Sequence, residues 1–195
     1  MYASWIDITG ENICERLNLG VLFEKKENPL EIDLGAGDGG FAVESACRLP
    51  EVNFLAIERL KGRALKIAKK ASRAQLTNLR VLRLDALYAL EYLIPPKSVS
   101  GLHLLFPDPW PKRRHAKYRI LQEPFLKALK KVLTGGGFFH FATDDEGYWI
   151  QGVRLLESDP SFITVEPLRE VPLSEFEQHW LERGKLPRHG WWLLR

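Results

Sequence analysis

The stretch PLEIDLGAGDGGF, Pro29 to Phe41, decides the fold class of this chain. Its first six residues are mostly apolar and predict a strand that ends at a run of glycines. The residues from Phe41 to Leu49 then have helical potential. Glycines in such a turn let the backbone come close to a ligand. A strand, a glycine-rich turn and a helix in succession indicate the first unit of an α/β sheet.

Apolar runs and helical stretches alternate along the rest of the chain. Further strands are predicted at residues 53–57, 79–84, 101–106, 138–142, 162–165 and 191–194. Helices are predicted at residues 60–71, 125–132 and 148–156, and the triplet Gly135 to Gly137 is expected to close the second of these. This alternation predicts the α/β class with a mostly parallel sheet. Since no repeat or linker divides the sequence, we expect one domain over residues 1–195, with 1–28 as a short lead-in and 29–195 as the core.

The composition of the 195 residues is typical of a globular protein, with 45% hydrophobic and 27% charged residues. No apolar stretch approaches the roughly 20 residues that a membrane-spanning helix needs. Two cysteines, Cys14 and Cys47, are too few for a disulfide framework, and the first residues lack the pattern of an export signal. We therefore expect a cytoplasmic protein without a membrane partner, and we expect Cys47 on the inner face of the first helix.

Positive charge is concentrated in the middle of the chain, although the net charge of the whole is only +3. Residues 51–135 hold 18 Lys and Arg against six Asp and Glu, a net charge of +12, whereas the segments before and after them carry −5 and −4. Such asymmetry indicates an anionic partner, with nucleic acid the leading candidate. A solvated basic face without a partner explains the composition equally well.

A carboxylate follows each of the first four predicted strands of the core. Ligands of an open parallel sheet bind beyond the carboxyl ends of its strands. The side chains at these ends are Asp33, Glu58, Asp85 and Asp108, and the fifth strand is followed by Thr143, Asp144 and Asp145. Solubility requires only some polar residue at a strand end, so four carboxylates in succession predict a functional rim.

The glycine-rich turn fits two kinds of cofactor. Read as G-x-G-x-x-G through Gly35, Gly37 and Gly40, it suits a dinucleotide, with Glu58 on the adenosine ribose. It also reads as the acid-x-G-x-G-x-G loop of S-adenosylmethionine-dependent methyltransferases. Asp33 favours the second interpretation, because a carboxylate is unfavourable beside a pyrophosphate and favourable beside a sulfonium and an ammonium group. In that case Glu58 suits the two ribose hydroxyls.

Asp85 and Ala86 then suit the adenine edge. A dinucleotide-dependent oxidoreductase stays open as the alternative, and so do an amino-group methyltransferase of nucleic acid and a non-catalytic RNA-binding module.

The run FPDPWPKRRHAKYRIL, residues 106–121, resembles the signature of the bacterial tRNA (guanine-N7)-methyltransferase family. ATDDEGY (142–148) and SEFEQ (174–178) follow in that family's order, and DLGAGDGGF and AIE precede it, so the resemblance covers about residues 29–195. It implies a class I methyltransferase: a Rossmann-like three-layer sandwich with a seven-stranded, mostly parallel sheet whose last strand is antiparallel. It also implies transfer of a methyl group from S-adenosylmethionine to the guanine at nucleotide 46, in the variable loop of tRNA.

The resemblance also implies roles for individual residues. Asp33, Glu58, Asp85 and Asp108 are expected to contact the methyl donor or its neighbourhood, where the family usually has Glu in place of Asp33. Other positions match the family's RNA-contacting and substrate motifs. The substrate-binding residues implied in this way are Lys112, Arg114, His115, Lys117, Arg119, Asp144, Ser174 and Glu177.

The chemistry of guanine N7 makes a general base unnecessary, because N7 has a free lone pair at neutral pH. The reaction is an in-line displacement whose main demand is alignment. Since the methylated purine carries positive charge, a nearby carboxylate would stabilise the developing cation. Asp108, held between Pro107 and Pro109, is the predicted catalytic residue; a simple turn aspartate is the alternative.

Two basic clusters are candidates for contact with tRNA phosphates. The first is the run from Lys112 to Arg119, directly after Asp108. The second runs from Arg59 to Arg73 along the next predicted helix, where solvation explains the charge equally well. The histidines show no spacing typical of a metal site, so no metal is predicted. The sequence leaves open whether the protein is a monomer or a homodimer.

Overall fold

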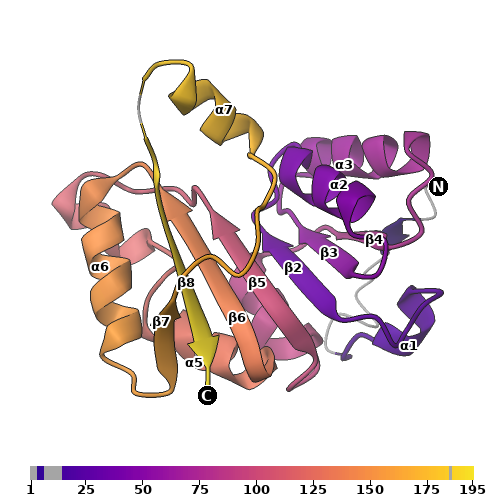
Figure 1. Cartoon of the computed structure of the whole chain (residues 1–195), viewed down its shortest axis with the longest axis horizontal. Helices are drawn as coiled ribbons and strands as arrows, with labels where there is room; N and C mark the ends of the chain where they lie inside the picture. The colour runs from indigo at the N-terminus through magenta and orange to yellow at the C-terminus, as the bar shows by residue number, and fades with distance from the viewer. Residues whose placement is uncertain (1–3, 7–14, 185) are drawn as a thin grey trace.

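The computed structural model describes residues 4–6, 15–184 and 186–195. Within this part of the chain eight strands form one sheet. They are β1 (Trp5–Ile6), β2 (Leu30–Leu34), β3 (Asn53–Ile57), β4 (Leu79–Leu82), β5 (Val99–Leu105), β6 (Leu133–Thr143), β7 (Phe162–Val165) and β8 (Arg188–Leu194). Their order across the sheet is β1-β4-β3-β2-β5-β6-β8-β7 (Figure 1).

Helices connect the strands. They are α1 (Leu19–Leu22), α2 (Gly40–Arg48), α3 (Lys61–Arg73), α4 (Ala86–Tyr88), α5 (Glu123–Val132), α6 (Glu146–Glu157) and α7 (Glu175–Leu181). A π-helical turn (Ala89–Leu93) continues α4, and a 3₁₀ helix (Arg113–Tyr118) follows β5. No helix in the described part of the chain is both long and apolar enough to span a membrane.

The two faces of the sheet pack against different helices. Along β3, Phe54 belongs to the buried cluster that contains the inner side of α3, whereas the next residue, Leu55, belongs to the cluster that contains α5 and α6. This alternation is the period of two expected of a strand buried on both faces. On α3 the buried residues Ala64, Ile67 and Ala68 have helical spacing. The architecture is therefore the predicted three-layer α/β sandwich.

The predicted direction of the strands is confirmed, and the predicted number needs a correction. Described pairs from β1 to β6 are parallel, and β8 is antiparallel to both β6 and β7. The sheet has eight strands rather than seven, because Trp5 and Ile6 pair with Val81 and Leu82 at the edge. Two residues are too short a run for a periodic pattern, so this strand left no signal in the sequence.

Two local expectations were wrong. The glycine triplet does not close a helix but lies inside β6, which begins at Leu133 directly after α5. A Cβ on Gly137 would lie 3.0 Å from Thr134 O and 3.1 Å from Val99 O, so the glycine permits close approach beside the irregular pairing of β5 with β6. Cys47 is exposed rather than part of the core, and Cys14 lies outside the described residues.

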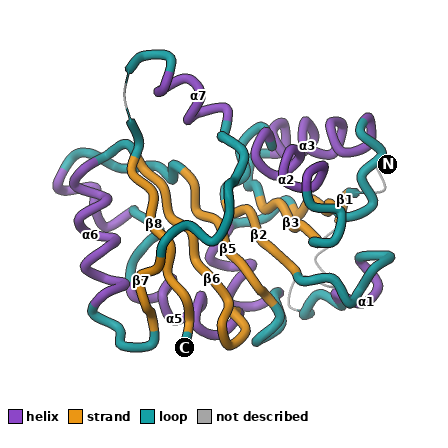
Figure 2. The backbone as a smooth tube through the Cα atoms, viewed as in Figure 1, coloured by secondary structure: helices purple, strands orange, loops and turns teal. Residues whose placement is uncertain are grey.

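The topology opens a crevice between β2 and β5. β2 pairs with β3 on one side and with β5 on the other, so the chain winds in opposite directions from this point. Figure 2 shows α7 over the end of the sheet at which the parallel strands finish. The segment between β7 and α7 returns across the front of the sheet to reach it (Figure 1).

Candidate active site

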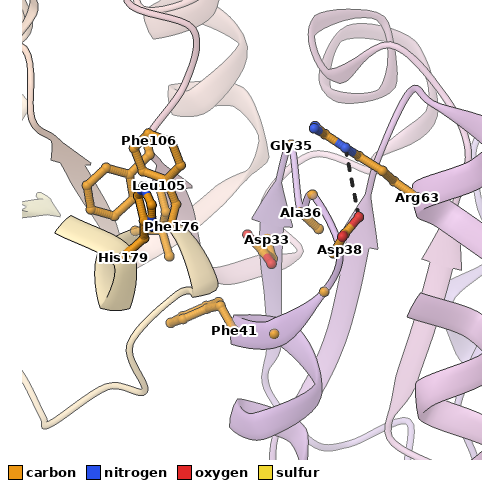
Figure 3. Close-up of a pocket in the computed structure, with 13 residues that line it drawn as sticks. Asp33, Gly35, Ala36, Asp38, Phe41, Arg63, Leu105, Phe106, Phe176 and His179 are labelled. Carbon is orange, nitrogen blue, oxygen red and sulfur yellow. Dashed lines mark ion pairs between the residues drawn. The ribbon is translucent and has the colours of Figure 1, made fainter. Parts of the chain in front are cut away.

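A cavity of about 520 Å³ lies at the carboxyl ends of β2 and β5. Its volume is within the range of small-molecule sites, about 300–1,000 Å³. In Figure 3 the glycine loop after β2 forms one wall, and Phe106 and two side chains of α7 form the other. The lining residues are Asp33, the loop 35–40, Phe41, Arg63, Leu105, Phe106, Phe176 and His179.

The glycine loop owes its path to left-handed backbone conformations. The φ angles of Gly35 and Gly37 are 72° and 57°, which side chains with a Cβ rarely adopt. The Gly35 N–H donates to the carbonyl of Ile57 at 2.8 Å, which holds the loop against the neighbouring strand. The loop then leads into the N-terminus of α2 at Gly40. The backbone therefore carries no side chain at Gly35 and Gly37, between and after which Ala36 and Asp38 also line the cavity.

Asp33 is buried beside the cavity, with 3% of its surface exposed. Its Oδ2 has no hydrogen-bond partner in the described structure, and Figure 3 shows the carboxyl group between the glycine loop and the opposite wall. Burial, together with the charge of Glu58, raises the pKa of Asp33 to about 7. A buried carboxylate without a partner is unfavourable unless a cation or donor joins it. The site therefore fits a ligand with positive charge, as the sulfonium and ammonium groups of S-adenosylmethionine have.

Glu58 supports the glycine loop from behind. Its Oε2 accepts the N–H of Gly37 at 3.0 Å, and its Oε1 accepts the N–H of Leu60 at 2.7 Å. Glu58 is not among the residues that line the cavity. Each carboxylate oxygen has a second lone pair, so these bonds leave acceptor capacity for ribose hydroxyls.

Asp85 and Ala86 stand at the end of β4, outside the cavity. Asp85 is the N-cap of α4, where its Oδ1 accepts the N–H of Tyr88 at 3.1 Å. The residues predicted to contact adenine therefore lie at the start of α4, and β3 separates β4 from the cavity at β2 and β5.

Asp108 occupies a constrained loop after β5. It is exposed, and its Oδ1 accepts the N–H of Trp110 at 3.3 Å. Phe106 and Trp110, on either side of it, have φ angles of 51° and 44°, a region that non-glycine residues seldom occupy. Each such residue costs of the order of 1–3 kcal/mol and persists only where its surroundings enforce it. The loop therefore holds Asp108 in one geometry.

The prediction that Arg119 contacts RNA requires a correction. Arg119 is only 9% exposed, and its Nε donates to the carbonyl of Pro109 at 2.7 Å. Its other nitrogens donate to Gln151 at 2.8 Å and to Asp145 at 3.4 Å, and the guanidinium lies 4.8 Å from the ring centroid of Tyr148. These contacts use three of the five N–H donors of Arg119 and join the Asp108 loop to α6.

The other residues of the basic run remain on the surface. Lys112, Arg114 and Lys117 are exposed, and none forms an ion pair with a carboxylate of the described residues. His115 packs edge-on against Trp110 at 5.8 Å between ring centroids. Trp110 is thus part of an aromatic cluster beside the basic run rather than of the core.

Ser174 and Glu177 make a capping box at the start of α7 instead of projecting toward the cavity. Ser174 Oγ accepts the N–H of Glu177 at 3.1 Å, and Glu177 Oε2 accepts the N–H of Ser174 at 3.4 Å. The structure therefore gives both side chains a role in starting α7, and their contact with substrate stays a prediction. Asp144 is exposed at the end of β6.

Several residues of the cavity were missed by sequence reasoning. Phe106, Phe176 and His179 form the wall opposite the glycine loop, and the rings of Phe106 and Phe176 lie 5.2 Å apart. The pattern Ser-x-x-Glu at Ser174 signals the start of a helix, so α7 could have been predicted. Its position over the cavity depends on tertiary packing and left no local signal.

Arg63 also lines the cavity, although the sequence placed it in a basic cluster of uncertain role. Its Nε lies 3.8 Å from Asp38 of the glycine loop. Among residues 4–6, 15–184 and 186–195, no three His, Cys, Asp or Glu side chains are grouped as a metal site requires.

Comparison with known proteins connects this geometry to a family. A family model described as a putative methyltransferase matches residues 27–186. The tRNA (guanine-N(7)-)-methyltransferase of Chromohalobacter salexigens is 37% identical over 188 residues, covering 92% of this chain and 74% of that protein. The protein of the same name from Vibrio cholerae serotype O1 is 38% identical over 177 residues, covering 87% and 72%. Among solved structures, a SAM dependent methyltransferase from Aquifex aeolicus has a TM-score of 0.59 at 15% identity, covering 97% of this chain and 95% of that one.

The structural match shows the fold, which is that of class I S-adenosylmethionine-dependent methyltransferases, as predicted. The sequence matches extend over most of both chains and include the glycine loop and the Asp108 loop. The chain belongs to the tRNA (guanine-N(7)-)-methyltransferase family.

Proposed function

We propose that this enzyme transfers a methyl group from S-adenosylmethionine to N7 of the guanine at nucleotide 46, in the variable loop of tRNA. The observation that carries the proposal is the buried, unpartnered oxygen of Asp33 in a cavity that is also lined by Phe106, two residues before Asp108. Such an oxygen stabilises a donor with positive charge, whereas a nicotinamide dinucleotide would bring the negative charge of its pyrophosphate to the site. Family membership supports tRNA and guanine N7 as the acceptor.

The residues at the ends of β2, β3 and β4 are proposed to hold the donor. Asp33 would pair with its positive charge, and the bare backbone at Gly35 and Gly37 would allow close approach. Glu58 would accept hydrogen bonds from the ribose hydroxyls while it keeps the N–H of Gly37. Asp85 and Ala86 would border the adenine, beyond the present limit of the cavity.

The chemistry requires alignment rather than proton removal. The donor supplies an electrophilic methyl group on sulfur, and guanine N7 attacks with its own lone pair. The protein's part is to hold the two partners in line, which the rigid loop at Asp108 serves. Asp108 then stabilises the positive charge that develops on the purine. Since the same loop follows Phe106 of the cavity wall, donor and base would meet at one rim.

Contact with tRNA is proposed for the exposed cations beside Asp108. Lys112, Arg114 and Lys117 have no carboxylate partner in the described structure and would each neutralise a phosphate. Such contacts position the RNA without reading its sequence. Asp144, at the end of β6, and His115 would border the base.

The proposal places the reaction in the cytoplasm and in one catalytic core over residues 29–195. All site residues named here come from one chain, so a monomer or a homodimer would serve, and sedimentation of the purified protein distinguishes them.

The test is methyl transfer to tRNA that lacks 7-methylguanosine, followed by mass analysis of the nucleosides. We expect 7-methylguanosine as the product, formed only with S-adenosylmethionine. Methylation of an exocyclic amino group would replace the proposal with an amino-group methyltransferase. Binding of tRNA without transfer would indicate an RNA-binding module, and a requirement for a nicotinamide cofactor would indicate an oxidoreductase.

A further inference from the structure

Five titratable residues outside the cofactor cavity form one continuous chain of hydrogen bonds. Glu31 Oε2 lies 3.0 Å from His103 Nε2, and His103 Nδ1 lies 3.1 Å from His140 Nδ1. His140 Nε2 lies 3.0 Å from His189 Nδ1, and His189 Nε2 lies 2.9 Å from Glu177 Oε1. The chain runs from β2 across β5, β6 and β8, which are neighbours in Figure 1, and ends on α7.

Strand register places the chain on one face of the sheet. His103 and His140 are directly paired residues of β5 and β6. Glu31 lies two residues before Asp33, the partner of His103, and His189 pairs with Ala142, two residues after His140. Residues two apart on a strand share a face. The four side chains therefore meet although they are distant in the sequence.

The interior of this chain is dry. His103 and His140 have no exposed surface, and Glu31 is 2% exposed. The indole of Trp191 stacks on His140 at 4.2 Å, and Phe41 lies 4.7 Å from His103. Toward the other end, the side chain of His189 is 27% exposed.

Counting protons shows that the chain is incomplete with neutral histidines. Its four hydrogen bonds need four protons, one in each bond. An ionised carboxylate only accepts, and a neutral imidazole carries one N–H, so three neutral histidines between two carboxylates supply three protons. A histidine chain closed by a carboxylate at both ends always lacks one proton. All four bonds form only when the chain carries one additional proton.

The surroundings decide where this proton lies. Burial acts to raise the pKa of Glu31, but hydrogen bonds from His103 and Arg169 outweigh it and lower that pKa, so Glu31 is ionised. Burial lowers the pKa of His103, although the negative charge of Glu31 acts to raise it. Burial also lowers the pKa of His140, and neighbouring positive charges lower it further. His189 is the partly hydrated ring, and it faces a carboxylate. A charged ring costs least where water and a carboxylate can reach it, so the additional proton lies at the His189 end of the chain.

One arrangement of protons then satisfies every bond. His103 donates from Nε2 to Glu31, His140 donates from Nδ1 to His103, and the imidazolium of His189 donates from both nitrogens. Arg169, from the segment between β7 and α7, pairs with Glu31 and is the charged group that faces the chain from the covering layer. Asp33, the strand partner of His103, lies on the same face of the sheet.

We propose that Glu31, His103, His140, His189 and Glu177 act together as positioning residues that hold α7 against the cofactor cavity, and that they do so most firmly while the chain carries its additional proton. Phe176 and His179 of α7 form part of the cavity wall, and Glu177 stands between them. When the proton leaves, one of the four bonds lacks a proton: either His189 Nε2 and Glu177 Oε1 become two acceptors 2.9 Å apart, or His189 keeps Glu177 through its single N–H and loses its bond to His140. In both cases α7 loses its ion pair with His189, which weakens the attachment of its N-terminus.

The direction of the pH dependence follows because protonation of the histidine chain strengthens the attachment of α7. The ion pair of His189 with Glu177 is present at low pH and is lost as the pH rises and the additional proton leaves the chain. Closure of α7 over the cavity, and with it the affinity for the methyl donor, falls in the same direction. The part that concerns donor affinity rests on the proposed function, whereas the proton count and the attachment of α7 do not.

The test uses the whole, ligand-free protein, with ¹⁵N-labelled histidine rings observed by NMR. At neutral pH we expect His189 with both ring nitrogens protonated, His103 protonated on Nε2 and His140 protonated on Nδ1. As the pH rises, we expect one proton to leave the chain. The exchange rate of the α7 amides should then rise by at least about tenfold more than that of the α5 amides, which report the effect of pH itself. Three neutral rings at neutral pH with α7 still protected would overturn the proposal.

Glu177→Gln tests the count without breaking the chain. A glutamine amide can donate to His189 Nε2 while its oxygen keeps the capping bond to Ser174 N–H, so four protons are present with three neutral histidines. We expect no imidazolium in this variant, and a protection of α7 that stays high and does not respond to pH. Glu182→Gln, an exposed residue at the end of the same helix, is the matched control and should behave as the wild type.

If Glu177→Gln keeps the wild-type response to pH, the chain does not govern α7 and the proposal fails. Neither measurement needs methyl donor or tRNA, so its failure is distinguishable from failure of the proposed reaction. Calorimetry with S-adenosylmethionine completes the test: the decline of affinity with rising pH should be present in the wild type and in Glu182→Gln, and absent in Glu177→Gln.

Discussion

Replacement of Asp33 by Asn should stabilise the ligand-free protein and weaken its binding of S-adenosylmethionine. The carboxylate is buried and has an oxygen without a partner. In the absence of a cation it opposes folding, and in the presence of one it is the strongest electrostatic contact that the site offers. Asparagine has nearly the same volume and no charge, so it separates the two effects.

The magnitude follows from the pKa of Asp33. Burial and the charge of Glu58 raise this pKa from 3.8 to about 7, so the folded protein binds a proton that the unfolded chain releases. Stability therefore falls as the pH rises from about 4 to about 7, by up to about 4 kcal/mol at 1.36 kcal/mol for each pKa unit. Above pH 7 the Asn variant should be more stable by a comparable amount.

Denaturant unfolding at several pH values, with and without donor, measures both effects. In the absence of donor, the decline in stability between about pH 4 and 7 should be smaller in Asp33→Asn than in the wild type. Calorimetry should show donor affinity lower by roughly ten- to a hundredfold, as expected for one charge-assisted contact. Glu44→Gln, an exposed carboxylate of α2, is the control and should change neither. Equal donor affinity and equal pH profiles for wild type and Asp33→Asn would refute the reasoning.

Three further variants test the other parts of the site. Asp108→Asn should lower turnover at least about tenfold and change donor affinity less, because it removes the charge opposite the developing cation; full single-turnover rate on saturating tRNA would reduce Asp108 to a turn residue. Arg119→Lys should lower turnover with an unchanged salt dependence of tRNA binding, because lysine cannot make the three contacts that hold the Asp108 loop; a flatter salt slope would show that Arg119 binds phosphate after all. Changing Arg114 and Lys117 together to Ala should reduce the slope of log affinity against log salt concentration. The reduction should correspond to one to two phosphate contacts, at roughly 0.7–0.9 for each contact, and donor affinity should stay unaltered. An unchanged slope would mean that the RNA binds elsewhere. The matched control pair lies on the exposed side of α3: Lys69 and Arg73.

Local pattern was sufficient to predict the strands from β2 to β8, the glycine loop and the carboxylates at the strand ends. These features depend on period, on turn chemistry and on the rule that parallel strands end at one edge. Asp33 is the clearest example, because its position after a strand and before the glycines already indicates a cation. Its missing partner and its raised pKa required the structure.

Features that arise from packing could not be predicted in this way. Arg119 belongs to a run of similar basic residues, and only its contacts with Pro109, Gln151 and Asp145 set it apart from Lys117. Likewise three of the four links of the histidine chain depend on strand register between segments that are far apart in the sequence, and the fourth depends on the packing of α7. A search for metal-ligand spacing along the chain therefore passed over them.

The central claim is that N7 of guanine 46 receives the methyl group, and two tRNAs that differ at one atom test it most directly. One carries guanine at nucleotide 46 and the other carries 7-deazaguanine, which has carbon in place of N7. The account predicts methyl transfer from S-adenosylmethionine to the first tRNA and none above background to the second, with equal binding of both. Equal transfer to the two tRNAs would contradict it.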